Sequence, residues 1–199
     1  MKTFSLVIIL ACVSLTAFAH DITLPAPQRS GGKPVTDLIN ERQSCREFAE
    51  TPLDLQTISD LLWAAYGFNR EDKRVIPTGL NKQELDVYII TKEGAYLYDA
   101  ANNKLILKTA GDHRQFAGKQ SYAQQAPVNF FYVNDETKGN GGGSYLSAGC
   151  AVQDVYLTVG SKGLGCTIRM SFESEPLKKL FKLNERQNIL AAQSIGQKK

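Results

Sequence analysis

The chain has 199 residues, of which 43% are hydrophobic and 22% are charged, a composition typical of one folded domain and unlike that of a disordered or collagen-like chain. Its 23 Lys and Arg residues against 20 Asp and Glu residues leave a formal net charge of +3. The basic residues are scattered along the chain, which argues against nucleic-acid binding.

The first 19 residues have the three parts of a secretory signal peptide. Lys2 precedes an apolar stretch at 4–15, and Ala17-Phe18-Ala19 has the small-x-small pattern of a cleavage site. We expect cleavage after Ala19 and a periplasmic or secreted mature protein. Lipoprotein processing at Cys12 is a less favoured alternative. No later segment reaches the roughly 20 apolar residues that a membrane-spanning helix needs.

Residues 20–33 are rich in proline and glycine and lack apolar periodicity, which predicts an extended N-terminal arm. Such an arm would either wrap a partner or fray. Residues 34–199 would then form the folded domain.

Two helices are predicted at the start of this domain. A short one runs from Pro34, which suits a first helical turn, to Arg42. A stronger one spans 55–66, with Asp54 as its N-terminal cap and Gly67 as its stop. We expect residues 68–84 to form a polar loop.

The next part of the chain is predicted to be mostly strand. Short strands at 85–91, 95–99 and 104–109 read as a β-meander. The run at 128–134 is almost continuously apolar, as expected of a central strand that is covered on both faces.

A glycine-rich loop at 135–143, either a gate or a simple connector, leads to a long helix predicted at 144–162. Gly163 would end this helix. Gly149 and Gly160 in its interior are costly unless another backbone packs close to them.

The last elements predicted are a strand at 166–170, a helix at 176–182 with Ser174 as its cap, and a closing strand at 189–195. Because strands and helices are interspersed, the sequence predicts a single α+β or mixed α/β domain.

Arginine and serine side chains cluster in Arg42-Gln43-Ser44-Cys45-Arg46. Two guanidinium groups and a hydroxyl suit an anion with several oxygens, such as phosphate. Arginines four residues apart are also common on solvated surfaces. A second candidate is the loop at 77–83, where Thr, Gly and Asn permit close backbone approach to a planar ligand, or form an ordinary connection.

Other catalytic chemistry is poorly supported by the sequence. With two histidines in the chain, a hydrolase would depend on His113, and there is no Gly-x-Ser-x-Gly nucleophile elbow. Gly163-Leu164-Gly165 follows a helix and precedes a strand, the reverse of a dinucleotide-binding motif. Cys45, Cys150 and Cys166 lack metal-knuckle spacing. An enzyme with these residues would take its chemistry from a cofactor.

Seven segments occur in a characteristic order from about Val35 to the C-terminus. They are RQSCREF (42–48), LLWAAYGFNR (61–70), IPTGLNKQELDVYII (76–90), YLYD (96–99), GKQSYAQQAPVNFFYV (118–133), SAGCAVQDVYLTVGSKGLG (147–165) and IRMSF (168–172). Together they resemble the nitroreductase-like flavoprotein family, nearest to its short dehydrogenase branch related to the azoline-peptide oxidases.

This resemblance implies an α+β fold with a central mixed or antiparallel sheet surrounded by helices. It also implies an intertwined homodimer that binds FMN in clefts at the subunit interface. Arg42 would meet the FMN phosphate, while Ser44 and Arg46 would reach the ribityl chain and the pyrimidine edge. A guanidinium near the ring favours reduced flavin, which carries negative charge.

Further residues are assigned by the same resemblance. They are Pro77, Thr78, Gly79 and Asn81 in the loop that covers the flavin from the other subunit, Gln120 beside the ring, and Met170 and Ser171, whose backbone N–H groups approach flavin N5. The implied chemistry is a ping-pong transfer of electrons to or from a small-molecule substrate. The electron donor is unidentified, since an export signal argues against NAD(P)H.

Two departures from the family favour an alternative, a redox-inactive relative that binds a flavin or another phosphorylated ligand. Met170 stands where many members have glycine. The basic pair that completes the phosphate site in longer relatives is missing, which leaves Lys198 or Lys199 as substitutes. A frayed C-terminus is the expected state of those two lysines.

Overall fold

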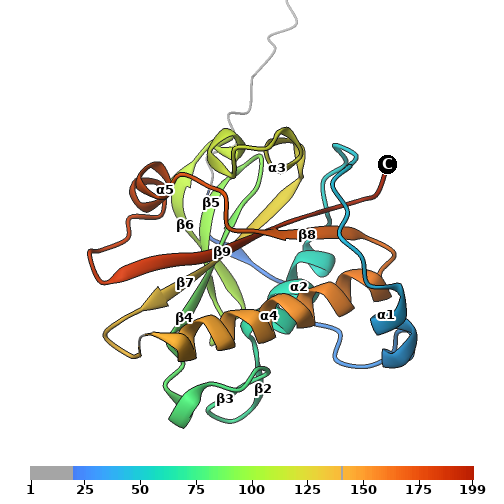
Figure 1. Cartoon of the computed structure of the whole chain (residues 1–199), viewed down its shortest axis with the longest axis horizontal. Coiled ribbons are helices and arrows are strands. Elements are labelled where there is room, and N and C mark those ends of the chain that lie inside the picture. Colours follow the sequence, from blue (N-terminus) through green and yellow to red (C-terminus); the bar gives the residue numbers. More distant parts are fainter. Residues whose placement is uncertain (1–19, 140) are drawn as a thin grey trace, which may run out of the picture.

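A seven-stranded sheet forms the centre of the computed structural model, which describes residues 20–139 and 141–199 (Figure 1). The expected signal peptide and the alternative processing site at Cys12 lie outside the described residues. The sheet contains β1 (Ile22–Thr23), β4 (Leu85–Ile90), β5 (Gly94–Asp99), β6 (Lys104–Ala110), β7 (Val128–Asp135), β8 (Gly165–Arg169) and β9 (Gln187–Gly196). The helices are α1 (Val35–Glu41), α2 (Leu55–Tyr66), α3 (Ser121–Gln125), α4 (Gly142–Ser161) and α5 (Ser174–Phe181).

The strand order is β1-β6-β5-β4-β7-β9-β8, and each neighbouring pair is antiparallel. The expected α+β class with a central sheet is confirmed, and the sheet is antiparallel rather than mixed. The predicted meander corresponds to β4, β5 and β6. The predicted central strand is β7, which lies between β4 and β9 and is buried from Val128 to Asn134.

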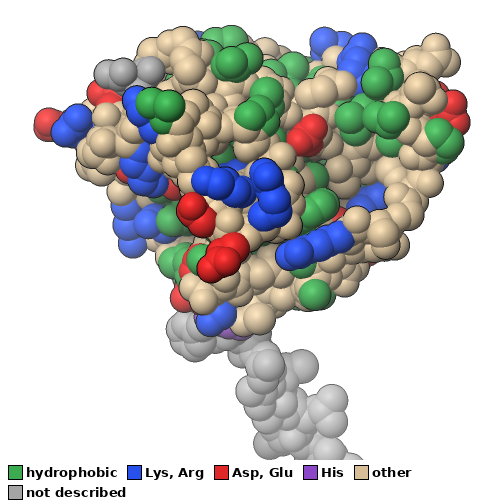
Figure 2. Space-filling model, turned by 90° about the horizontal axis from the view of Figure 1, so that it is seen from below, with side chains coloured by type: hydrophobic (Ala, Val, Ile, Leu, Met, Phe, Trp, Pro, Cys, Tyr) green, Lys and Arg blue, Asp and Glu red, His purple; other side chains and the backbone are tan. Residues whose placement is uncertain are grey.

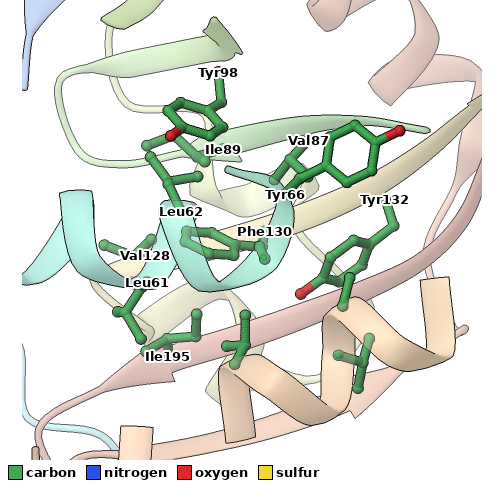
Figure 3. Close-up of a cluster of buried hydrophobic side chains, with 14 of the residues drawn as sticks. Leu61, Leu62, Tyr66, Val87, Ile89, Tyr98, Val128, Phe130, Tyr132 and Ile195 are labelled. Atoms are coloured by element: carbon green, nitrogen blue, oxygen red, sulfur yellow. The ribbon is translucent and has the colours of Figure 1, made fainter. Parts of the chain in front are cut away.

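Helices α2 and α4 cover one face of the sheet, and the larger hydrophobic core lies beneath them (Figure 3). Each labelled side chain in that view is at most 7% exposed, and burying one such side chain contributes about 1.5–3 kcal/mol. On the opposite face, α5 packs Phe181 against Tyr88 and Phe131, with ring centroids 4.8 and 5.1 Å apart.

The start of α2 confirms one predicted cap, and the start of α5 contradicts another. The Asp54 carboxylate accepts a hydrogen bond from the Thr57 backbone N–H at 2.7 Å, and α2 ends at Gly67. Ser174, expected to be the cap of α5, is instead its first helical residue. The extended residue before the helix is Glu173, whose side chain makes no capping hydrogen bond.

The N-terminal arm packs against the domain, and beyond Gln28 the Arg29 guanidinium still stands over the Trp63 ring, with Cζ 5.6 Å from the centroid. Its strand β1 pairs with β6, and Leu24 is 5% exposed. The Ser59 hydroxyl donates to the Pro25 carbonyl at 2.5 Å, and the Gln28 backbone N–H donates to Asp60 at 2.7 Å. This part of the arm therefore does not fray.

The polar loop expected at 68–84 contains more structure than predicted. It holds a small hairpin, β2 (Phe68–Arg70) with β3 (Lys73–Arg74), and a 3-10 turn at Gly79–Asn81. Strands of two or three residues are too short to show a period, so this hairpin left no pattern to read. The glycine-rich loop is also shorter than expected, because Gly142 and Gly143 lie in the first turn of α4.

Candidate functional site

Arg42 and Ser44 lie where α1 ends, beside the C-terminal half of α4. The Arg42 guanidinium stands over the ring of Tyr156, with Cζ 5.3 Å from the centroid. The Ser44 hydroxyl is 3.2 Å from the Tyr156 hydroxyl, which also accepts the backbone N–H of Ile168 at 3.0 Å. Tyr156 thus links the arginine-serine segment to β8.

The C-terminus is ordered and completes this region, so the expectation of a frayed end is wrong. Phe48 and Lys198 form an isolated antiparallel bridge, and the Ala49 N–H donates to the Gln197 carbonyl at 2.9 Å. The Cys45 N–H donates to the Cys166 carbonyl at 2.8 Å. The segment after Arg42 and the last residues of the chain therefore extend the β8–β9 edge as paired backbone.

A cavity of about 300 Å³ opens between these segments and the end of α4. Arg42, Lys198 and Lys33 line it together with Tyr156, while its one acidic neighbour, Glu41, is paired with Lys33 at 2.8 Å. The cavity therefore carries excess positive charge and donors suited to a phosphate. Arg46 is exposed and is not among the residues that line it.

The outer edge of β8 continues from this cavity toward Met170 and Ser171. Beyond the Cys45–Cys166 hydrogen bond, the end of β8 and the residues that follow it lie exposed at the edge of the sheet: Ile168 is 41% and Met170 is 65% exposed. The Gln120 amide donates a hydrogen bond to the Ser171 hydroxyl, and its Oε1 is buried without a partner among the described residues. The structure thus brings together three of the predicted ring contacts.

The loop with Pro77, Thr78, Gly79 and Asn81 lies at the opposite end of α4, beside its first turn. Asn81 donates to the Asp72 carbonyl at 3.1 Å, and Leu80 is 93% exposed. The loop lies beside Ser144 and Arg42 beside Tyr156, and the 12-residue step between those two positions of α4 corresponds to a rise of about 18 Å. The loop and α1, which precedes Arg42, lie toward opposite ends of α4 (Figure 1). Within a single chain the two groups therefore lie apart and line different cavities.

Two residues near the site, Tyr156 and Arg169, were not predicted from the sequence to be site residues. Tyr156 looked like one more apolar position of a long helix, and no local pattern marks a hydroxyl that meets two other segments. Arg169, 6% exposed, lies in β8 next to Met170. The one available signal was a charged residue at the end of a strand that is otherwise uncharged.

The remaining reactive side chains do not assemble a second catalytic centre in the described part of the chain. Cys45, Cys150 and Cys166 are free, and burial raises the pKa of Cys166 to about 12, so its thiol stays protonated. The His113 Nε2 atom lies 2.8 Å from the Ala110 carbonyl. Within 20–139 and 141–199, no cluster of three His, Cys, Asp or Glu side chains is arranged to hold a metal.

Charge elsewhere on the surface is mixed. On the face shown in Figure 2, Lys and Arg side chains are interspersed with Asp and Glu and form no continuous basic surface. Among the described residues, no helix combines the length and apolar character needed to cross a membrane.

Comparison with known proteins gives a consistent result. Residues 39–197 match the sequence model of the Nitroreductase family. A protein of Methanocaldococcus jannaschii described as a nitroreductase is 26% identical over 167 residues, which cover 75% of this chain and 84% of that protein.

Two solved structures superpose well on the chain. A protein of Ralstonia eutropha described as a nitroreductase is 33% identical with a TM-score of 0.84, over 91% of this chain and 90% of the other. A protein of Desulfovibrio desulfuricans described as a nitroreductase in complex with FMN is 20% identical with a TM-score of 0.62, over 84% and 88% of the two chains.

Proposed function

This chain belongs to the nitroreductase family, and we propose that it is an exported FMN-dependent oxidoreductase that passes electrons between a donor and a small-molecule substrate by a ping-pong mechanism. The family assignment supports an oxidoreductase of flavin type. The observation that carries the proposal is the convergence of Arg42 and Lys198 on one cavity beside β8, the last strand of the sheet.

The donors of this cavity fit the phosphate end of FMN. Arg42 offers a rigid fork of N–H groups and Lys198 a second positive charge, while the hydroxyls of Ser44 and Tyr156 lie next to them. Lys198 takes the place of the basic pair that longer relatives have after the last strand. Arg46, which is exposed, stays assigned to the pyrimidine edge as a prediction.

The exposed surface at the end of β8 fits the flat ring of a flavin. Ile168 and Met170 present exposed apolar surface there, and Gln120 and Ser171 supply polar groups beside it. When bound, FMN would supply the redox chemistry of the site. The chain's own residues hold and orient it, so no protein acid or base is required, in accord with the few histidines.

A homodimer is supported by the exposed side of α4. Tyr145 is 55% and Leu146 is 72% exposed, and apart from the backbone of α4 and the two neighbouring residues, no atom of the described chain lies within 4 Å of where a Cβ on Gly149 would stand. Within residues 20–139 and 141–199, no other segment packs against Gly149, so a second copy of the chain is the proposed source of that contact. Exposed apolar residues also lie at both ends of α4, with Leu80 at one end and Ile39 of α1 at the other.

A twofold axis across α4 would place the N-terminal end of α4 in one subunit against the C-terminal end of α4 in its partner. The loop with Leu80 would then reach the Arg42 cavity of the other subunit. This arrangement would give the loop at 77–81 the role that the resemblance implies, which is to cover the ligand of the other subunit.

The first experiment is the visible absorption spectrum of the mature protein purified from its natural compartment, followed by release and identification of any chromophore. We expect a flavin spectrum with one FMN per chain. A colourless protein that does not bind added FMN would contradict the proposal. Mass spectrometry of the same sample tests cleavage after Ala19.

The alternative, a redox-inactive binding module, rested on Met170 and on the missing C-terminal basic pair. Because Lys198 lines the cavity, Met170 is the departure that still favours this alternative. Met170 occupies the position where many relatives have glycine and is 65% exposed on the edge of β8. Dithionite reduction of bound FMN and reoxidation by an acceptor would exclude the module. The placement of the chain beside the azoline-peptide oxidases stays a prediction.

A further inference from the structure

A buried arginine without an acidic partner lies next to the candidate ring site. Arg169 is the last residue of β8 and is 6% exposed. Of the ion pairs formed by residues 20–139 and 141–199, none includes it. Its Nη2 donates to the Ala117 carbonyl and, at 3.0 Å, to Asn129 Oδ1. Its Nε and Nη1 are buried without a partner in the described structure.

The surrounding residues accommodate this charge without neutralising it. At Gly118, a Cβ atom would lie 2.6 Å from the Arg169 Nε, so the absence of a side chain there makes room for the guanidinium. The ring of Phe131 lies 5.7 Å from Cζ. Burial lowers the pKa of Arg169 to about 10, which leaves the group positively charged at neutral pH.

The guanidinium is connected to the ring site in two ways. Its backbone leads directly into Met170 and Ser171, the residues assigned to flavin N5. The Ala117 carbonyl that it holds lies three residues before Gln120, whose amide donates to the Ser171 hydroxyl. Arg169 therefore holds the segment that leads to Gln120, and it ends the strand that leads directly into Met170 and Ser171.

We propose that Arg169 is the internal counter-charge of this site and raises the reduction potential of the flavin bound there. The inference rests on the proposed FMN binding. The oxidised ring is neutral, and uptake of two electrons and one proton leaves it with one negative charge. A cation in a low-dielectric interior with no anion of its own stabilises that charge more than an exposed, salt-screened cation such as Arg46 does.

The test is the reduction potential of bound FMN, measured by dithionite titration against a reference dye. The variants are Arg169→Gln and Arg169→Met, which remove the charge, and Arg169→Lys, which keeps it. Arg186→Met is the matched control, since this exposed arginine lies just before β9, away from the site. We expect a lower potential in the Gln and Met variants and an unchanged one in the control, with Arg169→Lys close to wild type.

The same effect is measured by binding, because potential and affinity form one thermodynamic cycle. We expect the ratio of the Kd for reduced FMN to the Kd for oxidised FMN to rise at least tenfold in Arg169→Gln. A purely structural role would weaken both forms equally and leave the ratio unchanged. An unchanged ratio would overturn the inference while leaving FMN binding intact. So would a reduction potential that falls as far in Arg169→Lys as in Arg169→Gln.

The outcomes separate the inference from the proposed function. A wild-type protein that binds no flavin overturns both. If Arg169→Met does not fold, Arg169→Gln retains a donor for the Ala117 carbonyl and Arg169→Lys retains the charge, so the comparison between those two decides the question.

Discussion

Lys198 and Phe48 pair through an isolated antiparallel bridge, and this pairing holds the last residues of the chain beside the segment that follows Arg42. Because of it, the Lys198 side chain lines the same cavity as Arg42, while Lys199 lies one residue beyond. Adjacent lysines at one terminus thus differ in whether they reach the candidate phosphate site.

This difference gives a direct test of the phosphate site. We expect Arg42→Ala to weaken FMN binding by about 1.5–3 kcal/mol, the usual loss for a hydrogen bond to a charged group, which is roughly 10- to 150-fold in Kd. Lys198→Ala should weaken binding in the same direction, and Lys199→Ala should leave it within about twofold. Quenching of flavin fluorescence measures all three. Equal effects of the two lysine variants would contradict the placement of the phosphate.

A second prediction concerns the exposed side of α4. Leu146→Arg places a charge in the proposed subunit interface. Dimerisation would remove water from this charge, and the twofold axis would bring the same charge of the partner subunit close to it. We expect dimer association to weaken by about 2 kcal/mol or more, the cost of losing an interface anchor, and FMN affinity to fall with it. Light scattering after size-exclusion chromatography measures the association.

Phe116→Arg is the control for this experiment, because Phe116 is also a partly exposed apolar residue, at 38%, and lies outside α4. It should leave the dimer intact. A wild-type protein that is monomeric, or a Leu146→Arg protein that stays dimeric, would show that the apolar side of α4 is not the subunit interface.

The parts of the fold that were predictable are those whose signal is local. Helix α4 and the meander β4–β6 carry a regular period over many residues, and Asp54 marks a helix start with its own carboxylate. By contrast, β1 is two residues long, and its pairing with Lys104 and Leu105 lies about 80 positions away. No local pattern specifies such a contact.

The candidate site shows the same division. The Arg42–Arg46 cluster and the Met170–Ser171 pair could be proposed from the sequence because short motifs carry them; within the cluster, Arg42 lines the cavity and Arg46 does not. The contribution of Lys198 depends on the bridge to Phe48, and that of Arg169 on burial against a glycine at position 118. Both are tertiary effects. A chain terminus is expected to be poorly ordered unless a partner segment holds it, and the sequence does not reveal that partner.

A third prediction tests the cap of α2. Asp54→Ala removes the acceptor of the Thr57 N–H and should lower the free energy of unfolding by about 1 kcal/mol, which is about 2–4 °C in Tm for a domain of this size. Asp54→Asn keeps a side-chain acceptor and should retain most of the stability. Thermal unfolding followed by circular dichroism compares the three proteins. An alanine variant as stable as wild type would show that the cap is dispensable.

The last prediction uses the half-buried carboxyl of Asp154 on α4. Burial raises its pKa from 3.8 to about 6, so between about pH 4 and 6 the native state binds more protons than the unfolded chain. The free energy of unfolding should therefore fall as pH rises through this window and stay lower above it. The full shift is worth about 3 kcal/mol, and partial exposure to solvent reduces it to about 1–2 kcal/mol.

Asp154→Asn removes the carboxylate and should raise the free energy of unfolding at pH 7 by that amount, with little gain at pH 4. Urea unfolding of both proteins between pH 4 and 8 measures the difference. Glu185→Gln, at an exposed position, is the control for the loss of one negative charge and should shift stability by less than about 0.5 kcal/mol at either pH. Burial of the carboxylate affects Asp154 and not the exposed Glu185. An equal rise in the free energy of unfolding of both variants at pH 7 would therefore show that the effect comes from net charge.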